Sequence, residues 1–204
     1  MADVLLLFLL MDYKTALGGL SSLLVIISYL PYLVHVFQGK TKPHVYSWLV
    51  WAVLGGIGFG IQMQGNAGAG SWALGATALV CMAIFMLAVI RGEKHVHYVD
   101  TFSLVLASGS LAVWLTSHKP LVTAIAITLT DALGGFFPTF RKSYYAPYSE
   151  TASTYLINAL AFTISLFALT DFSASNLLYP ASLIVLNGGL SFYLVVRRTY
   201  VRKT

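Results

Sequence analysis

Long apolar runs separated by short polar connectors fill most of the chain, from residue 15 to residue 196. An apolar helix needs about 20 residues to cross the roughly 30 Å hydrocarbon core of a bilayer. By this measure the pattern predicts seven transmembrane helices, at residues 15–37, 44–64, 71–90, 98–117, 120–140, 150–170 and 176–196. Because the connectors are short, successive helices should pack as antiparallel neighbours. The sequence therefore predicts an all-α membrane protein.

Composition supports this class and excludes others. Of the 204 residues, 58% are hydrophobic and only 9% are charged, which is far from the composition of a soluble domain. The formal net charge of +5 does not indicate nucleic-acid binding, because membrane proteins gather Lys and Arg on their cytoplasmic loops. The expected partner is the lipid bilayer.

The placement of basic residues predicts the orientation of the chain. Ten of them follow odd-numbered helices: Lys40, Lys42, Arg91, Lys94, Arg141, Lys142, Arg197, Arg198, Arg202 and Lys203. Only Lys14 and Lys119 lie on the other side. Basic residues are retained in the cytoplasm, so the N-terminus should lie outside and the C-terminus inside. We expect a multi-pass protein of the cell membrane, either the inner or the plasma membrane.

An internal repeat divides the chain. Residues 28–51 read SYLPYLVHVFQGKTKPHVYSWLVW, and residues 135–158 read GFFPTFRKSYYAPYSETASTYLIN. Each copy has a proline near the end of an apolar run (Pro31, Pro138), a basic connector, a second proline (Pro43, Pro147) and a new apolar run. This predicts a three-helix repeat within residues 1–97, a linker helix within 98–119 and a second repeat within 120–204. The single linker helix makes the two repeats parallel.

The first copy, with its LPY, GKTKP and SWLVW segments, resembles the repeat of the SWEET, SemiSWEET and PQ-loop superfamily. The glutamine of a PQ motif is replaced here by Tyr32 and by Thr139. The resemblance implies a transporter that moves a small polar solute (a sugar, an amino acid or a related metabolite) by alternating access. It also leaves a second class open, because the KDEL receptor shares this architecture and binds a peptide without transport.

Asp131 is the strongest functional candidate, since it lies in the middle of a predicted span. A charged side chain at the bilayer centre costs roughly 2.5–3.5 kcal/mol on insertion scales, so Asp131 should face the bundle interior. No Lys or Arg occurs at matching depth in another span. Two interpretations remain: a proton-coupling or substrate-binding carboxyl, or a protonated one that bonds a neighbouring helix. In PQ-loop amino-acid transporters an aspartate before the second loop carries the coupled proton, and Asp131 resembles it in position.

Other polar and aromatic residues are candidates for substrate binding. Asn158 and Asn187 lie near mid-depth, where amides can bond a polar solute or another helix. The resemblance implies a pocket asparagine on the third helix of a repeat, which Asn187 matches. Trp48 and Trp51 share one helix face, and Tyr155 takes the place of Trp51 in the second copy. Such rings can stack on a solute or can form an interfacial belt.

Prolines inside apolar runs are candidate hinges. Pro31 and Pro138 each remove a backbone hydrogen bond and kink the helix, although prolines are also simply commoner in membrane helices. The chain contains no HExxH, no GxSxG and no glycine-rich phosphate loop with lysine. We therefore expect no enzyme activity, no metal and no cofactor. The expected ligands are a small solute and protons, and the pattern is compatible with a homo-oligomer.

Overall fold

In a computed structural model, the structure describes residues 12–39, 42–92 and 97–201, and these ranges contain helices and no strand. The long helices are α2 (Tyr13–Phe37), α3 (Val45–Gln64), α4 (Trp72–Arg91), α5 (Tyr98–Ser117), α6 (Pro120–Thr130), α7 (Phe137–Tyr145), α8 (Ala152–Phe167) and α9 (Ala174–Tyr200). The short elements are η1 (Gly68–Ser71), the π-helical turn η2 (Asp131–Phe136) and η3 (Pro147–Ser149). α6, η2 and α7 run on as one helical segment, Pro120–Tyr145.

The prediction of an all-α chain of membrane-length helices is confirmed. Six of the described segments are long and apolar enough to cross a bilayer, as in a multi-pass membrane protein. The predicted span 98–117 coincides with α5. The predicted span 150–170 is too long, because α8 covers 16 residues. Its expected last residue, Thr170, instead donates its backbone N–H to the carbonyl of Ala67, 3.1 Å away, in the turn after α3.

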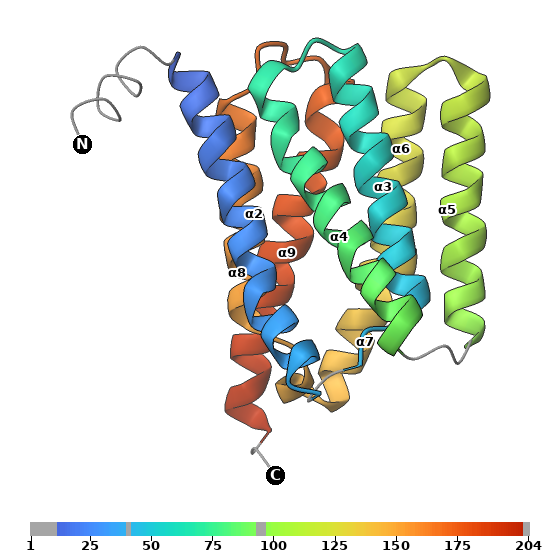
Figure 1. The fold of residues 1–204 in the computed structure, drawn as a ribbon, viewed down its shortest axis with the longest axis vertical. Coiled ribbons are helices and arrows are strands. Elements are labelled where there is room, and N and C mark those ends of the chain that lie inside the picture. Colours follow the sequence, from blue (N-terminus) through green and yellow to red (C-terminus); the bar gives the residue numbers. More distant parts are fainter. Residues whose placement is uncertain (1–11, 40–41, 93–96, 202–204) are drawn as a thin grey trace.

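We describe the helices as two sets in chain order, a first group α2–α4 and a second group α6–α9, and in Figure 1 α2 and α4 pass in front of α8 and α9. In the first group α4 packs against both α2 and α3, and in the second α9 packs against both α6 and α8. The groups meet where α2 lies along α8 and where α3 contacts α6. α5 stands at the edge of the bundle and packs against α3 and α6.

Small residues let the helices approach closely. A Cβ atom at Gly18 would lie 2.5 Å from the carbonyl oxygen of Ala69, and one at Gly55 would lie 3.2 Å from the backbone nitrogen of Ala78. In lipid there is no hydrophobic force between helices, so close packing at such positions is a main source of association. These glycines therefore hold α2 and α3 against η1 and α4.

The described basic residues gather at one end of the bundle. The C-terminal ends of α2, α4, α7 and α9 lie at the lower end in Figure 1, whereas the start of α2 and the ends of α3, α5 and α8 lie at the upper end. We call the lower end the basic end. It carries Lys42, Arg91, Arg141, Lys142, Arg197 and Arg198, while Lys14 and Lys119 lie at the opposite end; the other four basic residues fall outside the described ranges.

Proline inside α9 leaves a backbone acceptor that another helix satisfies. Pro180 has no N–H for the carbonyl of Asn176, one turn earlier. The side-chain amide Nε2 of Gln62 in α3 donates to this carbonyl at 2.9 Å. Proline is tolerated inside membrane helices when a neighbouring side chain replaces the missing donor in this way. The contact links α3 to α9.

This pairing predicts a specific coupling between Gln62 and Pro180. Gln62→Met keeps the volume but removes the donor, so it should lower the free energy of unfolding by about 1–3 kcal/mol. In a Pro180→Ala background the cost should shrink, because alanine restores the backbone N–H. The buried Oε1 of Gln62 has no hydrogen-bond partner, and its desolvation cost is the same in both backgrounds. It therefore cancels from the comparison. The free energy of unfolding is measured in detergent micelles for the wild type, both single variants and the double variant. An equal loss of stability from Gln62→Met in both backgrounds would refute the contact.

Candidate functional site

Asp131 lies at the junction of three segments of the bundle. Its side chain is only 1% exposed. The indole N–H of Trp51 in α3 donates to Oδ1 at 3.2 Å, and the hydroxyl of Tyr179 in α9 donates to Oδ2 at 3.2 Å. In the described part of the chain, the ion pairs are His44 with Asp100 and Lys142 with Glu150, so no described cation lies within 4.0 Å of the Asp131 carboxylate. Both of its hydrogen-bond partners are neutral.

The helix that carries Asp131 is locally widened. Asp131 begins the π-helical turn η2, a rare geometry that occurs frequently at functional sites. Pro138, in the first turn of α7, has no N–H for the carbonyl of Gly134. The hydroxyl of Ser103 in α5 lies 2.8 Å from this carbonyl and 2.9 Å from that of Val99, so its single proton is shared between the two acceptors and partly replaces the missing donor. The irregular turn is thus partly satisfied from a neighbouring helix.

Two glycines make room for the groups around the carboxyl. A Cβ atom at Gly135 would lie 2.6 Å from Oδ1 of Asp131 and 3.0 Å from Nε1 of Trp51. A Cβ atom at Gly58 would lie 2.8 Å from the ring of Tyr179. A larger residue at either position would force the carboxyl or one of its two donors to shift.

An aromatic cluster continues from Trp51 into α2. The ring centroids of Trp48 and Trp51 are 5.3 Å apart, edge to face, and Tyr29 lies 5.9 Å from Trp48. The indole N–H of Trp48 donates to the hydroxyl of Tyr32 at 3.1 Å. Trp48 is only 6% exposed, so it lies inside the bundle and not in an interfacial belt. Asp131 is therefore joined to α2 through a row of aromatic rings.

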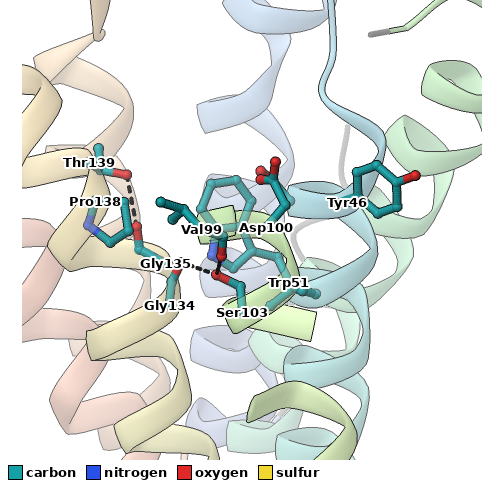
Figure 2. A pocket seen from close by; sticks show the side chains of 11 residues that line it. Tyr46, Trp51, Val99, Asp100, Ser103, Gly134, Gly135, Pro138 and Thr139 are labelled. Atoms are coloured by element: carbon teal, nitrogen blue, oxygen red, sulfur yellow. Dashed lines mark hydrogen bonds between the residues drawn. The ribbon is translucent and has the colours of Figure 1, made fainter. Parts of the chain in front are cut away.

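A small cavity of about 100 Å³ lies beside this row, between α3, α5 and the segment of η2 and α7. Figure 2 shows side chains from all three segments around it, with Trp51 and Gly135 on its walls. The cavity has room for a few water molecules and is smaller than the 300–1,000 Å³ typical of ligand pockets. Water molecules in this cavity would lie next to Trp51 and Gly135, which contact Asp131.

Asp100 lines the same cavity from the first turn of α5. Its Oδ2 accepts the backbone N–H of His97 at 2.8 Å and lies 3.5 Å from Nε2 of His44. Asp100, Ser103 and Tyr179 are absent from the sequence-derived candidates. An acidic residue three positions after His97 is a capping signal that could have marked Asp100. Nothing in the sequence pairs Tyr179 with Asp131.

The two predicted asparagines are buried but do not contact Asp131. Asn158 is 4% exposed and donates to the carbonyl of Thr154 at 3.1 Å, and its Oδ1 is buried without a hydrogen-bond partner. Asn187 is 6% exposed and donates to the carbonyl of Leu183 at 2.9 Å. Each amide thus bonds within its own helix. The free oxygen of Asn158 could still accept a hydrogen bond from a solute.

Tyr155 does not contact Asp131 and instead belongs to a cluster of polar contacts around Glu150, at the basic end. Its hydroxyl donates to Oε2 of Glu150 at 2.7 Å, and Lys142 approaches Oε1 of the same carboxylate at 2.9 Å. The guanidinium of Arg198 donates to the backbone carbonyl of Glu150. These contacts connect α7, α8 and α9 beside the connector. Sequence reasoning missed Glu150, because it lies at the edge of a predicted span.

The two predicted hinges occupy different positions in their helices. Pro31 lies inside α2, and near it the Thr154 hydroxyl of α8 donates to the carbonyl of Ser28 at 3.2 Å. Pro138 is the second residue of α7, two residues after the end of the π-helical turn at Phe136. Both interrupt regular backbone bonding, and their role as hinges stays a prediction.

Comparison of the chain with protein-family models, with curated proteins and with solved structures gives no match. Function must therefore be argued from the chemistry of the site.

The contact between Gly135 and Asp131 can be tested by adding one methyl group. Gly135→Ala should lower the melting temperature, because its Cβ would sit within 2.6 Å of Oδ1. Gly56→Ala is the matched control, since a Cβ there meets nothing within 4 Å. The control should leave the melting temperature unchanged or raise it slightly, as alanine is the better helix former. Equal melting temperatures for the two variants would contradict the crowded geometry.

Proposed function

We propose that this protein is a secondary transporter that moves a small polar solute by alternating access, with Asp131 as the binding site of a coupled proton. The solute class is a sugar, an amino acid or a related metabolite. The observation that carries this proposal is the buried Asp131 carboxyl, held by two neutral donors inside a bundle of membrane-length helices. An intramembrane carboxyl of this kind is by default a functional group.

The two partners of Asp131 suit a group that gains and loses a proton. The indole of Trp51 can only donate, so it holds Oδ1 in either state. The hydroxyl of Tyr179 can both donate and accept. It can donate to an ionised Oδ2 and, by rotating its proton away, accept from a protonated one. The carboxyl therefore keeps both hydrogen bonds in both states, whereas a fixed cation would oppose protonation.

The packing order supports two parallel three-helix repeats with α5 as the linker. Exchanging α2 with α6, α3 with α8 and α4 with α9 maps the contacts of each group onto the other. The two contacts between the groups, α2 with α8 and α3 with α6, also exchange with each other. This is the arrangement that the resemblance to the SWEET and PQ-loop superfamily implies. In our proposal the two repeats rock against each other, bending at Pro31 and at the π-helical turn before Pro138.

We further propose that the basic end faces the cytoplasm, since basic loops are retained there. Gln38 at the basic end and Phe172 at the opposite end are exposed and suit cysteine labelling. In a Cys81→Ala background and intact cells, an impermeant maleimide should label Phe172→Cys and not Gln38→Cys. The reverse pattern would invert the proposed orientation.

Removal of the titratable group is the direct test of coupling. Asp131→Asn keeps the shape and still accepts and donates hydrogen bonds, but it cannot bind a proton. In proteoliposomes it should reduce uptake driven by a pH gradient at least tenfold, while exchange at equal concentrations continues. A panel of radiolabelled hexoses, disaccharides and amino acids provides the substrates. Asp12→Asn, at an exposed carboxyl at the start of α2, is the control and should transport normally.

Two outcomes would contradict the proposal. Gradient-driven uptake by Asp131→Asn at the wild-type rate and pH dependence would leave Asp131 as an interhelical hydrogen bond. Saturable binding by the wild-type protein without any flux would instead favour a membrane receptor that binds its ligand without transport.

A further inference from the structure

A groove opens on the outside of the bundle at the basic end. α5 packs against α6 and η2, whereas α7 turns away from α5, which leaves a wedge between them (Figure 1). The resulting cavity has a volume of about 540 Å³. Its walls include Tyr98, Phe102, Leu133, Phe137, Arg141 and Tyr145. The groove does not include Asp131, Trp51 or Tyr179, although it shares Val99 and Pro138 with the small cavity beside Trp51.

The chemistry of the groove changes along its length. Phe102, Leu133 and Phe137 supply apolar surface on the side away from the basic end, and they are 48%, 49% and 63% exposed. Tyr98 and Tyr145, each about three-quarters exposed, lie towards the basic end. Tyrosines at that level are typical of the membrane–water interface. An amphiphile with an apolar chain and a polar head would match this gradient.

Two basic residues, Arg141 and Lys142, line the polar end of the groove. The side chain of Arg141 is exposed, and its Nη1 makes a long hydrogen bond of 3.5 Å to the hydroxyl of Tyr98. Among the described residues no carboxylate lies within 4.0 Å of its guanidinium, whereas neighbouring Lys142 is paired with Glu150 at 2.9 Å. Most donors of the guanidinium therefore remain available. A planar guanidinium binds phosphate oxygens in a bidentate manner.

We propose that this groove binds an anionic phospholipid, with its phosphate on Arg141 and an acyl chain along Phe102, Leu133 and Phe137. Basic pockets between transmembrane helices are suited to lipid head groups. A free phosphate would gain nothing from the apolar wall. A neutral lipid would place no compensating charge beside Arg141, so its affinity should be lower.

Native mass spectrometry of the purified protein in a neutral detergent tests the proposal. The protein is titrated with dioleoyl phosphatidylglycerol and with dioleoyl phosphatidylcholine, which differ in head group only. One basic residue near a lipid surface contributes about 1 kcal/mol, so the apparent affinity for phosphatidylglycerol should be about fivefold higher. Arg141→Gln should remove this preference. Arg91→Gln, which removes the same charge from the same end but outside the groove, should keep it.

The apolar surface that contacts the acyl chain and the site that contacts the lipid head group are tested separately. Leu133→Trp should fill the groove and reduce retention of both lipids several-fold, whereas Leu160→Trp, at a half-exposed leucine of α8, should not. Millimolar inorganic phosphate should fail to displace phosphatidylglycerol. Equal affinity for the two lipids, an equal effect of Arg91→Gln, or displacement by inorganic phosphate would each overturn the proposal.

Discussion

The buried carboxyl of Asp131 imposes the main constraint on this bundle. A carboxyl removed from water needs hydrogen-bond partners, because leaving a buried polar group unsatisfied costs about 1–3 kcal/mol or more. Trp51 and Tyr179 meet this need from two other helices. Gly135 and Gly58 leave room for this arrangement, because a Cβ atom at either position would crowd the carboxyl or the ring of Tyr179. The packing of α3, α9 and the π-helical turn is thus organised around one group.

Irregular backbone and interhelical polar bonds occur together in this protein. Pro138 and Pro180 each free a carbonyl, and Ser103 and Gln62 from other helices donate to those carbonyls. Without water in the bilayer core, such replacement donors are what make a broken helix tolerable. The helix segments interrupted by Pro138 and Pro180 therefore lie next to hydrogen bonds that hold neighbouring helices in place. A bend at either proline would either break the hydrogen bond to the partner helix or move that helix with it.

Sequence reasoning could predict the helices, because apolar length is a strong and local signal. It also predicted that Asp131 faces the bundle interior, and its 1% exposure confirms this placement. It could not predict Tyr179 as a partner, because that contact depends on how α9 packs on α3 at Gly58. The early end of α8 likewise depends on a tertiary contact, the bond from Thr170 to Ala67. Asn158 and Asn187 show the same limit, because an amide at mid-depth can equally bond its own helix.

The central claim is that Asp131 binds and releases a proton inside the folded bundle. Infrared difference spectroscopy of the reconstituted protein across a pH titration observes this directly, through the C=O stretching band of a protonated carboxylic acid. Because other carboxyls also titrate, we expect one band of the wild-type titration to be absent in Asp131→Asn and shifted in Tyr179→Phe, where one hydrogen bond is lost. Titration spectra of the wild type and of Asp131→Asn that show the same C=O bands would contradict the account.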